Sequence, residues 1–451
     1  MPSWGTTPDM RRLLYALILA AASPVAAGKL TLDQVIAKAV ANPKVQMVNG
    51  DAAAAAARVD EADAARYPRV KGTAFATISP EIKCQPSAPD PTGQLCLTTQ
   101  PSNFAFEFSG LFETAQVDVT QPLYTFGKIS HARAAARAGL DAQRALANEA
   151  AGDVAVDAAR AYWGLKVARE MGGMLDDGLE EIDKAKKDFD DKHGATIQDR
   201  QRLAVLLAEA KAERTEAAEL EGQALAGLKA LTGDPDADID DSELAAIAHD
   251  LPEQVPIDHR PQRLAAKAGA TAADELAAYE SSQYFPDIAL VGSAVYSHAD
   301  GVANPPSAFA WDPYRRQGAG LGIGLQWTLE PWNVSARADR AKAEAHKSHA
   351  QAELAEIGAR YDATIARADA VQAHERVAVT AEGEKAARTW LASVLQNQAI
   401  GTAESRDLVD AYLAWFTMRA RWAKAVLDWN VDVVRLGRAT GEYRAGAIRP
   451  R

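Results

Sequence analysis

Aromatic residues, cysteines and long apolar runs are all scarce in this chain of 451 residues. Phe, Trp and Tyr together make up 7% of the chain although 48% of its residues are hydrophobic, and alanine supplies much of that share. Small side chains provide little bulk for a large globular core, but they let helix backbones approach closely. Composition therefore predicts a protein of helices packed against helices.

Catalytic signatures are missing as well. The sequence holds no G-x-S-x-G elbow, no phosphate-binding Walker loop and no H-E-x-x-H motif, so we expect neither an enzyme nor a bound cofactor. His346 and His349 have a spacing that suits a shared metal on a helix, but Lys342 and Lys347 beside them would repel a cation, and we expect a surface pair without a metal. The net charge of -12 opposes binding to nucleic acid.

The first residues indicate export. Arg11 and Arg12 precede an apolar run at residues 13–22, and Val25, Ala26 and Ala27 are the small residues of a cleavage site. This pattern predicts a secretory signal peptide over residues 1–27. A membrane anchor is disfavoured because the run is short, and no later run reaches spanning length.

The two cysteines, Cys84 and Cys96, lie close together in a loop rich in Pro, Ser and Thr. An exported protein meets an oxidising compartment, where such a pair forms a disulfide most simply. A metal site would need more ligands than this loop offers. We therefore expect a disulfide between Cys84 and Cys96.

The chain contains an internal duplication. Matching landmarks follow one another in the same order in both halves: Asn42-Pro43 with Arg260-Pro261, Tyr67-Pro68 with Phe285-Pro286, Gly194 with Gly401, Asp199 with Asp407, and Thr232-Gly233 with Thr440-Gly441. A duplication of this length indicates one structural unit built twice. We expect the repeats at residues 28–232 and 261–443, an irregular linker at 233–260 and a C-terminal tail at 444–451.

Each repeat is predicted to contain two β-strands. Apolar and polar residues alternate along the predicted strands, which gives each strand one apolar and one polar or small face; the strands cover residues 69–79, 111–123, 287–296 and 318–329. The glycines at every second position from Gly318 to Gly324 do not fit a nucleotide-binding motif, and they suit a barrel strand that leaves room in a lumen. Aromatic residues gather at the strand ends, as at the two interfaces of a membrane barrel; those on the helix side include Tyr124, Phe126, Trp327 and Trp332.

The helices are too long for a compact domain. Hairpins are predicted at residues 128–232 and 333–439, and a first helix of about 60 residues would span on the order of 90 Å. Along the last helix every seventh position, counted from residue 408, is Leu or Trp. This heptad spacing is typical of helix packing, and its residues are Leu408, Trp415, Trp422, Trp429 and Leu436. Because four strands cannot close a barrel and open edges are not tolerated in lipid, several chains must share one barrel.

With these features the sequence resembles the TolC-like outer membrane efflux proteins of Gram-negative bacteria. The resemblance covers nearly all of the mature chain, and its most specific part is the strand-to-helix junction at residues 120–128; the others are Leu30-Thr31-Leu32, Asn42-Pro43, Tyr67-Pro68, and Ile400-Gly401-Thr402 continuing to Asp407-Leu408-Val409-Asp410-Ala411. It implies a mostly α-helical protein whose helical hairpins form a periplasmic α-barrel, with four strands per chain in a β-barrel shared by a homotrimer in the outer membrane.

The resemblance also implies a function and its residues. The chain would be the passive exit duct of a tripartite efflux or type I secretion system, with a periplasmic adaptor and an inner-membrane pump as partners and outer membrane lipid around its barrel. Asp407 and Asp410 match the family's periplasmic aperture segment and would face the tunnel axis. The hairpin tips would meet the adaptor, through Gly194, Ala195, Thr196, Gly401 and Thr402. The alternative is an extended structural or adhesive coiled-coil protein, which would explain the helices but not the amphipathic strands.

Overall fold

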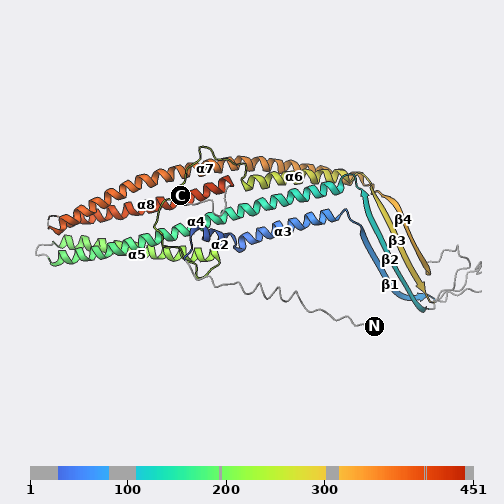
Figure 1. The fold of residues 1–451 in the computed structure, drawn as a ribbon, viewed down its shortest axis with the longest axis horizontal. Coiled ribbons are helices and arrows are strands. Elements are labelled where there is room, and N and C mark those ends of the chain that lie inside the picture. Colours follow the sequence, from blue (N-terminus) through green and yellow to red (C-terminus); the bar gives the residue numbers. More distant parts are fainter. Residues whose placement is uncertain are drawn as a thin grey trace, which may run out of the picture. The chain divides into compact units, whose positions relative to one another are not determined.

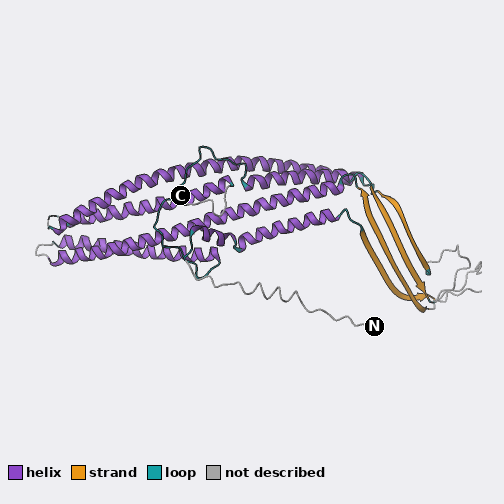
Figure 2. Cartoon of the chain, viewed as in Figure 1, coloured by secondary structure: helices purple, strands orange, loops and turns teal. Residues whose placement is uncertain are grey.

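The computed structural model describes residues 29–80, 108–191, 196–300, 314–400, 402 and 404–441. Two rounds of helix, strand pair, long helix and return helix follow one another along the chain (Figures 1 and 2). The elements are α2 (Leu32–Val40), α3 (Pro43–Ala64), β1 (Arg69–Pro80), β2 (Phe108–Tyr124), α4 (Lys128–Asp191), α5 (Ile197–Thr232), α6 (Pro261–Ser282), β3 (Asp287–Ala299), β4 (Arg316–Gln326), α7 (Pro331–Ala399) and α8 (Ser405–Thr440). No helix in the described ranges is both long and apolar enough to cross a membrane.

Two compact units make up the described chain. The helical unit contains the described residues up to Ala52, then Ala142–Ala266 and the residues from Ala352 on; the sheet unit contains Ala53–Asp141 and Lys267–Gln351. Each unit takes segments from both sequence repeats. A repeat is therefore not a compact unit by itself, because its strands pack with the strands of the other repeat.

The sheet unit holds a four-stranded antiparallel sheet in the order β1-β2-β3-β4. Directly opposed residues point to the same face, so the register sorts the side chains into two faces. We call one the apolar face; its residues include Val70, Ala74, Ile78, Val117, Val119, Leu290, Ala294, Leu321, Ile323 and Leu325. We call the other the polar face; its residues include Lys71, Thr73, Thr114, Gln116, Asp118, Ser293, Ser297 and the glycines of β4.

The amphipathic strand pairs predicted from the sequence are confirmed. Many apolar-face side chains are open to the surroundings, with Leu321 at 75% and Ile323 at 74% exposure. The strand ends differ slightly from prediction: β3 continues to Ala299, and β4 ends at Gln326 instead of residue 329. α7 begins at Pro331, two residues before the predicted start, because proline is well suited to a first helical position.

The core of the helical unit combines small and large apolar residues. Its main cluster joins α2, α4, α5 and α8, with Ala155, Ala158 and Ala159 of α4 fully buried. Among the heptad residues of α8, Leu408, Trp429 and Leu436 are buried, while Trp415 and Trp422 are partly buried against the clusters. The spacing therefore serves packing, as predicted.

The linker at residues 233–260 is held to α4 by a buried polar contact. Lys166 is 5% exposed, and its ammonium lies 2.9 Å from the Asp240 carboxylate and donates to the Ser242 carbonyl at 2.7 Å. The Tyr162 hydroxyl donates to Asp240 at 2.7 Å. Burial by itself would raise the pKa of Asp240, but these hydrogen bonds outweigh it and lower the pKa below its usual value. The irregular linker thus has a fixed path along the helix.

Candidate functional site

Two hairpin tips lie at the same end of the helical unit, one between α4 and α5 and one between α7 and α8 (Figure 1). One apolar cluster holds the four helix ends together, and its residues come from every one of these helices: Ile182, Leu203, Leu206, Ala210, Leu391, Val394, Leu408, Ala411 and Tyr412. The cluster fixes the rotation of each helix about its own axis, because a helix must turn its apolar stripe inward.

Asp407 and Asp410 occupy the first turns of α8, on the side turned away from this cluster. Leu408, Ala411 and Tyr412 are buried, whereas both aspartates are exposed. Asp410 lies 3.6 Å from Arg406 one turn earlier, a surface pair that contributes little. Asp407 makes no ion pair or hydrogen bond with any residue that the structure describes. The side that carries the two carboxylates is therefore free to meet solvent or a tunnel.

At the first tip the N-terminus of α5 is capped. Thr196 is the N-cap of α5; its hydroxyl accepts from the Asp199 backbone at 3.2 Å, and the Asp199 carboxylate accepts from the Thr196 backbone at 3.1 Å. This reciprocal capping box satisfies two backbone donors at once. Gly194 and Ala195, the other predicted docking residues of this tip, lie outside the described residues.

The second tip begins differently. Glu404 is the N-cap of α8 and makes no side-chain cap hydrogen bond. Thr402 turns back on the preceding helix: its backbone N–H and its hydroxyl both donate to the Asn397 carbonyl, at 2.9 and 3.1 Å. Gly401 is outside the described residues. Asp407 holds the same third helical position as Asp199, but it has no capping partner.

The four predicted interface aromatics lie where strands meet helices in the sheet unit. The ring of Phe126 contacts that of Tyr124 at 4.6 Å and stacks on Phe285 at 5.3 Å. Trp327 donates from its indole N–H to the Tyr284 carbonyl at 3.1 Å, and Trp332 is 85% exposed. Their assignment to a membrane interface stays a prediction, which the exposure of Tyr124, Trp327 and Trp332 supports.

The two strand-to-helix corners turn by different means. At the first, Phe126 and Gly127 both adopt positive φ angles, 49° and 95°. At the second, Glu330 precedes Pro331 and accepts from the Asn333 side chain at 3.2 Å. Positive φ is uncommon for a residue with a side chain, so the ring contacts of Phe126 help to hold that corner.

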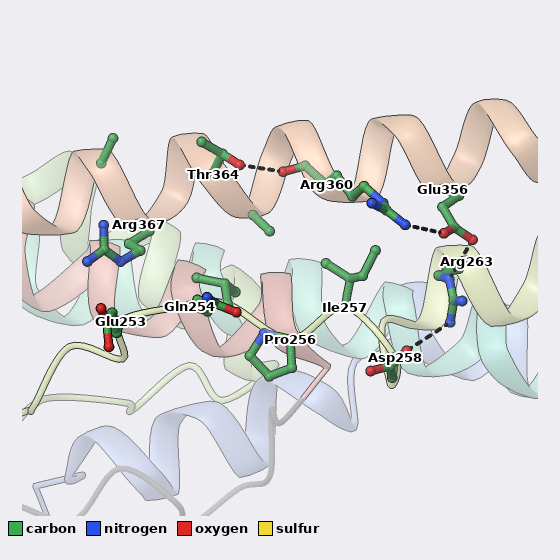
Figure 3. A pocket seen from close by; sticks show the side chains of 13 residues that line it. Glu253, Gln254, Pro256, Ile257, Asp258, Arg263, Glu356, Arg360, Thr364 and Arg367 are labelled. Carbon is green, nitrogen blue, oxygen red and sulfur yellow. Dashed lines mark hydrogen bonds and ion pairs between the residues drawn. The ribbon is translucent and has the colours of Figure 1, made fainter.

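A cavity of about 690 Å³ lies between the linker and α7 in the helical unit (Figure 3). Glu356 joins two of its arginines, Arg360 at 2.8 Å and Arg263 at 3.1 Å, and Arg263 also lies 3.5 Å from Asp258. The hydrogen bonds from Arg360 and then Arg263 hold the pKa of Glu356 below its usual value. Because these charges neutralise one another, we interpret the cavity as a gap in the polar contact between the linker and α7, not as a ligand site. No pattern in the sequence indicated this cavity, because its residues come from two segments about 100 positions apart in the chain.

Other predicted residues have plain surroundings. His346 and His349 are both exposed, and His349 lies 2.9 Å from the Asp274 carboxylate. In the described part of the chain, no group of three or more potential ligands is placed to hold a metal. Cys84 and Cys96 are outside the described residues, so their disulfide stays a prediction.

Comparison with known proteins supports the resemblance seen in the sequence. The model of the family described as outer membrane efflux protein matches residues 255–442. No curated protein sequence matches the chain. Its fold is similar to that of three solved outer membrane proteins: VceC from Vibrio cholerae (18% identity, 91% of this chain and 96% of that one, TM-score 0.72), the CmeC channel from Campylobacter jejuni (16%, 98% and 93%, 0.70) and the open state of the MtrE channel from Neisseria gonorrhoeae (18%, 94% and 93%, 0.69). At these identities the likeness establishes the fold.

Proposed function

We infer that this chain is an outer membrane channel that extends into the periplasm and serves as a passive exit duct. Residues 255–442 match the model of the outer membrane efflux protein family. The observation that carries the inference is the sheet: one face is apolar through the middle of the four strands, while the other carries most of the polar residues and the glycines of β4. That arrangement suits lipid on one side and a water-filled lumen on the other. Substrates would enter from an inner-membrane pump.

The sheet also supports an oligomer with a shared barrel, and the resemblance to efflux proteins makes a homotrimer the proposed state. In the described chain β1 and β4 each pair on one side only, and open strand edges are not tolerated in lipid. Strand directions alternate, so β1 of one copy can pair antiparallel with β4 of the next. Outside the sheet, α7 exposes an apolar stripe at helical spacing, which a neighbouring copy would cover: Leu354, Ile357, Tyr361 and Ile365.

Native mass spectrometry of the detergent-solubilised protein, with planar-bilayer conductance, tests this assembly. We expect trimers and a conducting pore. A monodisperse monomer that inserts into membranes would contradict the shared barrel.

The proposed aperture consists of Asp407 and Asp410. Their exposed side of α8 and the match of residues 407–411 to the family's aperture segment support this role. In a symmetric oligomer each aspartate would become a ring of carboxylates, which attracts cations and repels anions. The alternative is an ordinary solvated helix face.

The hairpin tips are the proposed docking surface for a periplasmic adaptor. Each tip carries an exposed isoleucine, Ile197 at 78% and Ile400 at 74%, beside the predicted docking residues Thr196 and Thr402. Exposed apolar side chains at a tip suit a partner that covers them. We expect Ile197→Asp with Ile400→Asp to abolish export in cells at normal protein abundance, while Met47→Asp, at a position of similar exposure, leaves it intact. Export at wild-type levels in the double variant would contradict docking at the tips.

An extended structural or adhesive protein remains the second candidate function. It would need the long helices but not a sheet with one apolar face. Absence of conductance from a correctly assembled, membrane-inserted oligomer would favour it over the duct.

A further inference from the structure

The polar face of the sheet carries an aromatic cluster that the alternation of polar and apolar residues does not explain. Phe75 pairs with Thr114 and Phe112 pairs with Thr77, so both phenylalanines project from the same face as Lys71, Gln116 and Asp118. Val291 and Val295 of β3 also lie on this face, but they are the only other large apolar side chains on it in the paired positions, and aromatic rings among polar residues call for a role.

Three rings make up this cluster. Phe75 and Phe112 lie with ring centroids 5.9 Å apart in an edge-to-face arrangement, and Phe112 contacts Tyr314 in the same manner at 5.7 Å. Such contacts are favourable geometries for aromatic pairs. The partner of Phe112 on β3 is the small Ala299, which leaves room for the ring of Tyr314 to contact Phe112. The rings come from β1, from β2 and from the segment two residues before β4, so the cluster spans the width of the sheet.

The cluster lies at the end of the sheet where the β1–β2 and β3–β4 hairpins close. Pro80 pairs with Phe108 and Ser297 pairs with Arg316 at this end, whereas the other strand ends lead into the long helices (Figure 1). Phe75 is 54% exposed despite its ring contacts. Part of the aromatic surface therefore stays available above the polar face.

We propose that Phe75, Phe112 and Tyr314 form an aromatic contact site on the luminal face, near the loop end of the barrel, for exported compounds that carry aromatic rings. The proposal rests on the proposed duct, because it takes the polar face as the lumen. In a trimer the cluster would occur three times around the pore, so a flat ring that leaves the channel would stack on one of the copies. Arg316 lies on the same face, so the site selects for rings and not for positive charge.

The test compares two cations of equal charge as blockers of single-channel current: tetraphenylphosphonium, which carries four aromatic rings, and tetrabutylammonium, which carries none. The influence of Arg316 on charge is the same for both. We expect tetraphenylphosphonium to block the wild-type channel more strongly, and Phe75→Leu with Phe112→Leu to reduce its apparent affinity about tenfold with little change for tetrabutylammonium. Leucine keeps the apolar volume and removes the rings.

Tyr296→Leu is the matched control. Tyr296 is 46% exposed in the same sheet, but its pairing with Gln317 and Ala115 places it on the apolar face. We expect its removal to leave the preference for tetraphenylphosphonium unchanged. Equal block by both cations in the wild type, or a preference that survives the Phe75 and Phe112 substitutions, would overturn the contact site.

A second measurement separates this proposal from the duct. If no variant conducts, including the wild type, the duct is contradicted, and calorimetric titration of the detergent-solubilised protein with the same two cations then decides the contact site. Tighter binding of tetraphenylphosphonium by the wild type and the Tyr296 variant than by the double leucine variant supports it. Equal binding by all three overturns it.

Discussion

The two return helices, α5 and α8, have the same length and end in the same way, but they begin differently. Each has 36 residues and is followed by a glycine in the left-handed conformation, Gly233 with φ 67° and Gly441 with φ 73°. At the start, Thr196 closes a capping box with Asp199, while Glu404 leaves Asp407 without such a partner. The two helices thus share their length and their C-terminal end, but only at the second tip does the aspartate at the third position have no capping partner.

The ends also differ in their surroundings. A side chain at Gly233 would meet open space, whereas a Cβ at Gly441 would overlap the His259 carbonyl. The second repeat therefore packs its helix end against the end of the linker, and the first does not. This contrast separates the conformational role of a C-terminal glycine from its packing role.

The largest expected effect is that of Gly441→Ala. At both positions alanine would have to adopt a left-handed conformation, at a cost of about 1 kcal/mol. At position 441 its Cβ would in addition overlap the His259 carbonyl. We expect Gly441→Ala to cost about 3 kcal/mol or more, and Gly233→Ala to serve as the matched control. Thermal unfolding of the detergent-solubilised protein, followed by circular dichroism, measures both. Equal shifts in the two variants would show that the packing at Gly441 has no energetic weight.

Next in size is the effect of removing the aspartates at the second tip. Asp407→Asn with Asp410→Asn should lower the cation-to-anion permeability ratio about threefold or more, and should weaken block by divalent cations, if these side chains line the pore. Asp199→Asn is the control, because Asp199 is bound in its capping box. Planar-bilayer reversal potentials measure the ratio. Unchanged selectivity in the double variant would place the aspartates on an ordinary solvated face.

A smaller effect is expected from exchanging the caps. Glu404→Thr would offer Asp407 the hydroxyl that Asp199 already has, and should stabilise the protein by about 0.5–1 kcal/mol. Thr196→Ala should cost about as much. The same Glu404 variant should also lower cation preference, since it ties down the Asp407 carboxylate. If stability rises while selectivity stays constant, Asp410 alone would carry any selectivity.

The smallest effect concerns pH and Asp432, whose counterpart in α5 is Ala224 at the offset that relates Asp199 to Asp407. Burial raises the pKa of Asp432 to about 6, and Arg435 at 3.5 Å opposes that rise. In the unfolded chain this carboxyl titrates near 3.8. The folded state therefore holds the proton more tightly, and this contribution to stability is lost as pH rises through about 6.

Asp432→Asn should accordingly be more stable than the wild type at pH 8 and nearly equal to it at pH 4. We expect a difference of less than about 1 kcal/mol, because the substitution also removes the contact between Asp432 and Arg435, which offsets part of the gain. Ala224→Ser, a small polar change at the α5 counterpart, should show no such pH dependence. A constant difference between wild type and Asp432→Asn at all pH values would contradict titration in this range.

Much of the fold follows from local pattern. Alternation along β2 and β4 set the two faces of the sheet, and the Thr-Gly pairs set the ends of α5 and α8, because each depends on residues close in sequence. Length and periodicity likewise predicted α4 and α7. The resemblance to efflux proteins came from short motifs such as the junction at residues 120–128.

Only the tertiary structure decided the features that join distant residues. One local feature was missed as well: the matched landmarks made Asp199 and Asp407 equivalents, although Thr196 and Glu404, three residues before them, already differ in the sequence. Lys166 contacts Asp240 although the two lie 74 positions apart in the chain. Phe75 contacts Phe112 because of the strand register, which local pattern does not specify. By itself the sequence determined which segments are helix or strand and which faces are apolar. The fold decided which polar groups are paired and which stay free, because pairing depends on where the whole chain brings them.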